Sequence, residues 1–198
     1  MTAARRSASG AAAGRISSGR NRVRIIAGQW RSRVIHFPAA SELRPTPDRV
    51  RETLFNWLGQ RLDGLECLDL FAGSGALGFE ALSRGAKRVV MLERDRRVAA
   101  ALRESASALA ASGAEVVEGD AIAWLARPGE RFDVAFVDPP YASGLAAQAL
   151  ERLPARLRPG ARVYVESADT LDAGAGWRVL REDRAGAVRY ALLEPAHP

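Results

Sequence analysis

Residues 67–78 read Cys-Leu-Asp-Leu-Phe-Ala-Gly-Ser-Gly-Ala-Leu-Gly, and this stretch decides the fold. It opens with a short apolar run that has the character of a strand, and Gly73, Gly75 and Gly78 follow with the spacing G-x-G-x-x-G. Glycines placed in this way permit a tight turn and let the backbone approach a ligand closely. The motif alone is weak, because glycine-rich turns also serve packing, but a strand and a helical pattern flank it as a binding turn requires. The stretch therefore predicts a strand, a ligand-binding turn and a helix.

Downstream of this unit, short apolar runs alternate with helical patterns. We expect strands at 67–71, 89–92, 115–117, 132–137 and 161–166, and a terminal antiparallel hairpin formed by 177–180 and 188–193. Alternating strands and helices predict a mainly parallel sheet that is covered on both faces. The fold class is therefore α/β, with a doubly wound, Rossmann-like sheet and one reversed strand near its edge.

A different pattern precedes the glycine-rich unit. Val23 and Ile25 alternate with arginines, residues 27–29 can form a turn, and residues 34–37 are again mostly apolar. This pattern predicts a small hairpin with arginine on its polar side, where it could face a phosphate backbone.

A helix is expected next, because apolar residues recur at helical spacing from Val50 to Leu62. We expect Thr46 as its N-cap, Pro47 at its first position and Gly64 at its end. The chain then divides into three parts: a disordered basic tail (1–21), the hairpin and helix (22–63) and the sheet domain (64–198).

Composition excludes several classes of protein. Apolar residues are 47% of the 198, which suffices for a core. No apolar run approaches the roughly 20 residues that a membrane span needs, so we expect a soluble, cytoplasmic protein. The lone Cys67 excludes a disulfide scaffold, and His36 and His197 lie too far apart in sequence for a recognisable metal site. We therefore expect no metal, and a monomer.

The basic charge is concentrated at one end of the chain. Residues 1–41 contain no acidic residue, and their arginines exceed the formal net charge of +6, so the rest of the chain is slightly acidic. These arginines are Arg5, Arg6, Arg15, Arg20, Arg22, Arg24, Arg31 and Arg33. Such asymmetry indicates contact with a polyanion such as nucleic acid. A solubilising tail, or an organelle transit peptide in the first residues, remains an alternative.

Two further acidic residues stand at strand ends. Glu93 follows Gly73 by about 20 residues, where an acidic group can bond the ribose hydroxyls of a nucleoside cofactor. Asp120 could accept a hydrogen bond from an adenine amino group, but it could equally cap the helix that follows. The sequence leaves both readings of Asp120 open.

The sequence Asp138-Pro139-Pro140-Tyr141, which we call the acceptor loop, ends the strand at 132–137. Two prolines make this loop rigid and remove backbone donors, so Asp138 and the Pro139 carbonyl can each accept one hydrogen of an amino group. Holding both hydrogens aims the nitrogen lone pair at an electrophile, and the Tyr141 ring offers a face on which a planar base can stack. A purely structural turn would explain the two prolines, but not their combination with Asp138 and Tyr141 at the end of a strand.

Together these segments resemble class I S-adenosylmethionine-dependent methyltransferases that act on amino groups. Residues 24–28 (Arg-Ile-Ile-Ala-Gly) and 43–58 (Leu-Arg-Pro-Thr-Pro-Asp-Arg-Val-Arg-Glu-Thr-Leu-Phe-Asn-Trp-Leu) narrow the resemblance to the bacterial RsmD family of 16S ribosomal RNA guanine-N2 methyltransferases. The resemblance covers nearly everything after residue 22. It implies the seven-stranded methyltransferase sheet and S-adenosylmethionine as cofactor. Ser32 departs from the pattern, because a glycine is expected after the first hairpin turn.

The resemblance also assigns site residues. The cofactor would contact Asp69, Phe71, Ala72, Gly73, Ser74, Gly75, Glu93, Arg94, Asp120 and Ala121. The guanine would be held by the catalytic residues Asp138, Pro139, Pro140 and Tyr141. The charge pattern of the hairpin already predicts RNA contact by Arg22, Arg24, Arg31 and Arg33. The resemblance adds Arg44, Thr46 and Arg51, although helix initiation and surface ion pairing would also explain these three.

The expected partner is 16S ribosomal RNA, within a small ribosomal subunit or an assembly intermediate. Three other functions remain open. The acceptor loop suits adenine N6 or a glutamine side chain equally well on chemistry alone. The glycine motif also fits a nicotinamide-dependent oxidoreductase, and the fold could persist in a non-enzymatic assembly factor.

Overall fold

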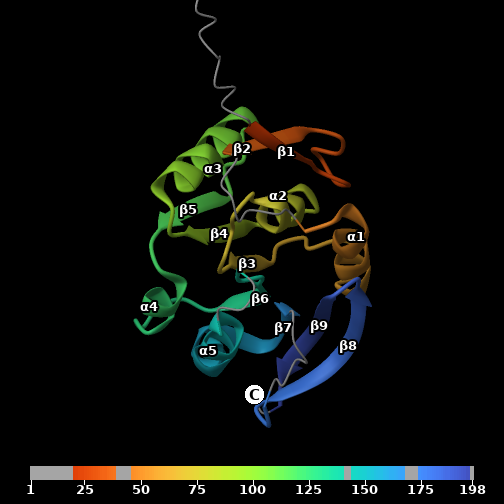
Figure 1. The fold of residues 1–198 in the computed structure, drawn as a ribbon, viewed down its shortest axis with the longest axis vertical. Coiled ribbons are helices and arrows are strands. Elements are labelled where there is room, and N and C mark those ends of the chain that lie inside the picture. Colours follow the sequence, from red (N-terminus) through yellow and green to blue (C-terminus); the bar gives the residue numbers. More distant parts are fainter. Residues whose placement is uncertain (1–19, 39–45, 141–143, 168–173, 197–198) are drawn as a thin grey trace, which may run out of the picture.

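The computed structural model describes residues 20–38, 46–140, 144–167 and 174–196, and a seven-stranded sheet forms its centre (Figure 1). The elements are β1 (Arg20–Arg24), β2 (Val34–Pro38), α1 (Asp48–Trp57), β3 (Glu66–Asp69), α2 (Ala76–Ser83), β4 (Arg88–Glu93), α3 (Arg96–Ala108), β5 (Ala114–Glu118), α4 (Ala121–Leu125), β6 (Phe132–Val137), α5 (Leu145–Arg152), η1 (Leu153–Arg156), β7 (Leu157–Ser167), β8 (Trp177–Ala185) and β9 (Val188–Pro195). The strand order is β5-β4-β3-β6-β7-β9-β8. Strands β3 to β7 run parallel, and β9 pairs antiparallel with both β7 and β8. The expected α/β fold with a reversed terminal hairpin is confirmed.

The central strands of the sheet are buried on both faces, as their continuous apolar runs require. On one face, Val50 and Leu54 of α1 and Phe79 of α2 belong to a cluster that also includes the small β1–β2 hairpin. On the other face, Leu125 of α4 and Leu150 of α5 complete a second cluster. Figure 1 shows the hairpin lying beside α2 and α3, away from α4 and α5. The hairpin therefore extends one layer of the domain.

Helix α1 is shorter than its apolar pattern predicted. It ends at Trp57, not at Gly64, because Gly59 takes a positive φ of 89° and its amide donates to the Asn56 carbonyl. A left-handed glycine just past the last turn is a common way to end a helix. Leu62 is still buried, but it belongs to the connection to β3.

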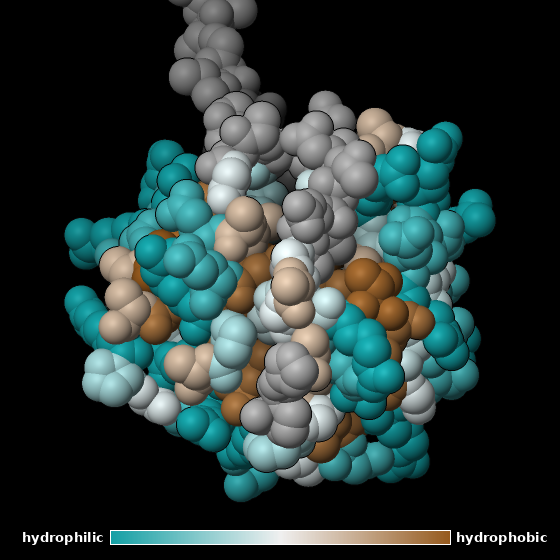
Figure 2. Space-filling view, turned by 90° about the horizontal axis from the view of Figure 1, so that it is seen from below, coloured by the Kyte–Doolittle hydropathy of each residue, from teal (hydrophilic) through white to brown (hydrophobic). Residues whose placement is uncertain are grey.

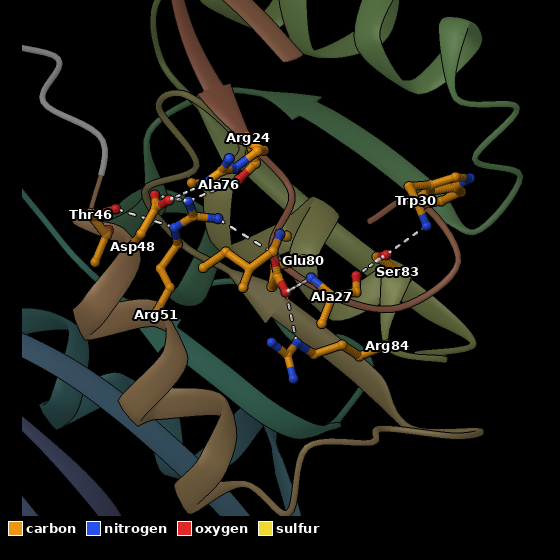
Figure 3. Close-up of polar contacts among 12 residues, drawn as sticks. Arg24, Ala27, Trp30, Thr46, Asp48, Arg51, Ala76, Glu80, Ser83 and Arg84 are labelled. Carbon is orange, nitrogen blue, oxygen red and sulfur yellow. Dashed lines mark hydrogen bonds and ion pairs between the residues drawn. The ribbon is translucent and has the colours of Figure 1, made fainter. Parts of the chain in front are cut away.

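The hairpin is fixed to α2 by polar contacts from residues 26–30 (Figure 3). The amides of Ile26 and Ala27 donate to the Glu80 carboxylate at 2.7 and 3.0 Å, and the amide of Trp30 donates to the Ser83 hydroxyl at 3.0 Å. Gly28 has a φ of +81°, and a Cβ there would lie 1.8 Å from the Ser83 carbonyl oxygen. The Arg-Ile-Ile-Ala-Gly motif therefore has a packing role, with the glycine required for close contact with α2.

Ser32 occupies the hairpin position where a glycine was expected, and its φ is +68°. A left-handed conformation costs a non-glycine residue roughly 1–2 kcal/mol, so the glycine expectation had a backbone cause. We predict that Ser32→Gly raises the free energy of unfolding by about 1 kcal/mol. Urea denaturation measures this directly, and a decrease would show that the serine side chain contributes more than the strain costs.

The outer surface is mixed in character. Figure 2 views the molecule from below the orientation of Figure 1. Hydrophilic residues surround this face, and hydrophobic residues are exposed in separate small areas between them. Within the described ranges, no helix combines the length and the hydropathy that crossing a membrane requires.

Candidate active site

The glycine turn (residues 71–75) follows β3 and is fixed by carboxylates at both ends. Gly73 and Gly75 have positive φ values of 48° and 78°. The Gly73 amide donates to Glu93 at 3.0 Å, and the Gly78 amide donates to Asp69 at 3.1 Å. A Cβ on Gly78 would lie 2.6 Å from the Met91 sulfur, so this glycine allows α2 to pack against β4. Carboxylates from β3 and β4 thus hold the turn in shape.

Glu93 ends β4 beside this turn, as predicted. Besides the Gly73 bond, its other carboxylate oxygen accepts from the Asp95 amide at 2.8 Å. The side chain is half-buried, and both contacts are to backbone amides. A carboxylate fixed at this strand end can still accept hydrogen bonds from a ribose, because each oxygen has a second lone pair.

Asp120 is the N-cap of α4, and its carboxylate accepts from the Ala123 amide at 2.8 Å. Of the two roles that the sequence allowed for Asp120, the helix cap is therefore confirmed. The cap uses one oxygen of the Asp120 carboxylate. A hydrogen bond from the cofactor's adenine amino group to the other oxygen stays a prediction. Among the other predicted cofactor residues, Ala72, Ser74 and Ala121 are buried, Phe71 is half-buried and Arg94 is exposed.

Asp138 lies at the same edge of the sheet as the glycine turn, because β6 is the neighbour of β3 and the Leu70 amide donates to the Phe136 carbonyl. Its carboxylate accepts from the Thr46 hydroxyl at 3.0 Å. The expected N-cap role of Thr46 is wrong: Pro47 precedes the first helical residue, and no side chain caps α1. Thr46 is 6% exposed, and its hydroxyl binds Asp138 of the acceptor loop instead of capping α1.

Three carboxyl groups with raised pKa values gather at this edge. Burial, with Asp138 nearby, raises the pKa of Asp69 to about 7. Burial raises the pKa of Asp138 to about 6, against the opposing effect of the Thr46 hydrogen bond. Burial and Asp138 raise the pKa of Glu166 to about 8. Such shifts are common where a protein keeps carboxyl groups ready for a ligand or a reaction.

Glu166 was not among the predicted site residues. It lies at the end of β7, is 3% exposed and accepts from the Tyr164 hydroxyl at 2.7 Å. In the sequence it appeared only as the last residue of an expected strand. The signal was present, because Asp69, Glu93 and Asp138 also stand at ends of parallel strands.

The predicted RNA-contact residues differ in their surroundings. Arg51 is 0% exposed and bonds to Glu80, Asp48 and two backbone carbonyls, so it is not available to a substrate (Figure 3). Thr46 is buried too, whereas the described arginines of the hairpin are exposed: Arg22, Arg24, Arg31 and Arg33. Arg24 pairs with Asp48, and Arg33 donates to the Ala108 carbonyl. Arg44 and Tyr141 lie outside the described residues.

The strand order, the glycine turn after the first parallel strand and the acceptor loop beside it define a class I S-adenosylmethionine-dependent methyltransferase. The chain belongs to the family described as Conserved hypothetical protein 95, whose model matches residues 23–194. The expected resemblance to the RsmD family is thereby confirmed.

Individual relatives agree with this assignment. The chain is 44% identical over 184 residues to the ribosomal RNA small subunit methyltransferase D of Escherichia coli K12, covering 89% of this chain and 92% of the relative. It superposes with a TM-score of 0.81 and 44% identity on the putative methyltransferase yhhF from Escherichia coli, covering 88% and 98% of the two chains. The Thermus thermophilus 16S rRNA N2 G1207 methyltransferase (RsmC), solved with AdoMet and guanosine, gives a TM-score of 0.66 at 26% identity, covering 88% of this chain and 49% of that one.

The described residues fit a cationic nucleoside cofactor. Asp69, Glu93 and Asp138 end the adjacent strands β3, β4 and β6, and within the described ranges no lysine or arginine is hydrogen-bonded to any of them. A sulfonium and an ammonium group would supply the missing positive charge, and Glu93 is placed for the ribose. In the same part of the chain, no group of three or more His, Cys, Asp or Glu residues could hold a metal ion.

Proposed function

We propose that this methyltransferase transfers the methyl group of S-adenosylmethionine to the exocyclic N2 amino group of a guanine in 16S ribosomal RNA. The observation that carries the proposal is the position of Asp138, buried beside the glycine turn with one oxygen fixed by Thr46. Family membership and the relative named ribosomal RNA small subunit methyltransferase D support ribosomal RNA as the substrate. The relative solved with guanosine supports guanine as the base.

The acceptor loop provides the chemistry of recognition. S-adenosylmethionine supplies an activated methyl group, so the protein needs no strong base. Asp138 and the Pro139 carbonyl each accept one hydrogen of the amino group, which directs the nitrogen lone pair toward the methyl carbon. These acceptors interact more strongly as positive charge develops on nitrogen, so they favour the transition state over the bound substrate. The base must leave its stack to reach this loop.

The exposed arginines of the β1–β2 hairpin suit the RNA backbone. Arg22 and Arg31 are exposed and make no ion pair within the described ranges. Phosphate contacts of this kind position a nucleic acid without reading its sequence. We propose that the substrate is the small ribosomal subunit or an assembly intermediate in the cytoplasm, bound by a monomer of this protein.

Methyl transfer from labelled S-adenosylmethionine tests this function. Small subunits that lack the one guanine modification should accept label, and mapping should place it on a guanine N2. Matched subunits that already carry the modification serve as the control and should remain unlabelled. Label on DNA, or on an adenine amino group, with none on the subunits would establish the alternative substrate class instead.

Cofactor affinity should depend on pH through Asp69. Its pKa of about 7 means that the carboxyl group loses its charge as the pH falls through neutrality, and a neutral group no longer stabilises a cation. We predict that S-adenosylmethionine affinity falls between about pH 8 and pH 6, approaching tenfold per unit below the pKa.

Titration calorimetry at several pH values measures this affinity. Asp69→Asn keeps a carbonyl oxygen for the Gly78 amide, so it should bind weakly at every pH with a flat profile. The product S-adenosylhomocysteine has no charge on sulfur and should show a smaller pH dependence than the substrate. Equal slopes for Asp69→Asn and the unaltered protein would assign the dependence to another group.

A further inference from the structure

Glu166 stands beside the acceptor loop although the mechanism above does not use it. Strands β6 and β7 run parallel with Val137 opposite Val165, so Asp138 and Glu166 are the next residues on neighbouring strands. Glu166 is also paired in register with Tyr190 of β9. At 3% exposure it is a buried acid at the edge of the sheet where the cofactor and the guanine are expected.

Hydroxyl groups bind both carboxyl groups, and Thr46 interacts with Asp138 and with Glu166. The Tyr164 hydroxyl donates to one Glu166 oxygen at 2.7 Å. The Thr46 hydroxyl donates to Asp138 at 3.0 Å and also interacts with the Glu166 carboxyl group. A hydroxyl has one hydrogen to donate and lone pairs to accept, so it cannot donate to both carboxylates at once. Both carboxyl groups can bond to Thr46 at once if Glu166 carries a proton and donates to the Thr46 oxygen.

The surrounding charges favour that proton. The titratable groups that act on Glu166 and its partners are Asp138 on β6, Asp69 on β3, Tyr164 on β7 and Tyr190 on β9. All of these are acids, and burial raises the pKa of Glu166 to about 8 and that of Asp138 only to about 6. Two buried carboxyl groups this close do not both ionise easily, so one shared proton resides on the group with the higher pKa.

We propose that Glu166 is a positioning residue which, as a neutral acid, donates to Thr46 and thereby fixes Thr46 as a donor to Asp138. Asp138 then stays ionised and oriented, with an oxygen available for the guanine amino group. The inference rests on the proposed function for what Asp138 binds, but the protonation state of Glu166 can be tested without any substrate.

The first experiment is a titration of the protein labelled with ¹³C at glutamate carboxyl carbons, with the Glu166 signal assigned from Glu166→Gln. The Glu166 carbon should titrate above neutrality. A midpoint near that of an ordinary glutamate, about 4.3, would overturn the inference whether or not the protein methylates RNA. Failure of guanine methylation with a high Glu166 midpoint would instead overturn the proposed function.

The second experiment compares the pH profiles of kcat. Glu166→Gln retains an oxygen for Tyr164 and an N–H for Thr46, so it should keep kcat within about threefold of the unaltered enzyme at neutral pH. Glu166→Leu lacks both groups and should lose roughly tenfold or more in kcat with little change in cofactor affinity. Above about pH 8 the unaltered enzyme should slow as Glu166 ionises, and Glu166→Gln should not.

The variants separate positioning from simple packing. If Glu166→Gln is as slow as Glu166→Leu, an ionised carboxylate is needed and the inference is wrong. If Glu166→Leu keeps full activity, the interaction through Thr46 does not matter. Because Glu166→Gln preserves shape and both hydrogen bonds, its profile remains interpretable even where Glu166→Leu is poorly folded.

Discussion

Replacing Asp138 with asparagine should reduce methyl transfer by about 10²–10³-fold or more, the usual loss when one group that stabilises transition-state charge is removed. Asparagine presents an NH₂ group to Thr46 or to the guanine, where the reaction requires an acceptor. It also removes the negative charge that stabilises the positive charge developing on the attacking nitrogen. The expected loss is in kcat, because the effect is stronger in the transition state than in the bound substrate.

Cofactor affinity distinguishes this effect from general damage. Asp138→Asn should bind S-adenosylmethionine within a few-fold of the unaltered protein by calorimetry, since Asp69 and Glu93 remain. The matched control is Asp133→Asn, at the other end of the same strand, where the carboxylate pairs with Arg158 and accepts from the Glu66 amide. This control should affect stability and leave kcat nearly unchanged. Retained turnover in Asp138→Asn would mean that another group holds the amine.

Local patterns were sufficient to predict most strands of the sheet. Strand β6 was predicted with its observed bounds, because buried parallel strands are continuous apolar runs. Helix α3 also begins at a local signal, because the Asp95 carboxylate caps it by accepting from the Arg97 and Val98 amides. Strand β8 continues to Ala185, beyond the predicted end at Leu180, because its exposed polar residues pair with β9 and show no apolar alternation.

The contacts that complete the site could not be predicted in this way. Thr46 and Asp138 are 92 residues apart in sequence, and nothing local to Thr46 distinguishes an active-site donor from a helix cap. Arg51 belongs to an arginine-rich helix and was expected at the surface, yet it is buried. A polar residue whose partner is far away in sequence is predicted to be exposed, because only the folded chain shows that the partner is there.

Replacing Arg51 with alanine should lower the free energy of unfolding by about 3–5 kcal/mol, the usual effect of breaking a buried ion pair by removing one partner. Arg51 and Glu80 are both 0% exposed, and Arg51 also donates to Asp48 and to the Thr46 and Arg24 carbonyls. Alanine removes all of these bonds at once and opens a cavity. Chemical denaturation with urea measures the change.

A surface pair provides the comparison. Arg61 and Asp63 are joined at 2.7 Å, but both side chains are mostly exposed. Arg61→Ala should therefore change stability by less than about 1 kcal/mol, because water and salt already screen the pair. If Arg51→Ala and Arg61→Ala lowered the free energy of unfolding by similar amounts, burial would not make the Arg51–Glu80 pair more stabilising than a surface pair.

Arg51 should affect catalysis as well as stability, and a third variant separates the two effects. Its guanidinium joins the Thr46 carbonyl, the end of β1 and Glu80 of α2, so it fixes the position from which Thr46 binds Asp138. Arg51→Met fills much of the same volume, and Glu80 keeps Arg84 at 2.8 Å and two backbone amides. Part of the lost stability should return with methionine. Turnover should stay low, because an apolar side chain cannot hold the Thr46 carbonyl, and full recovery of kcat would contradict this positioning role.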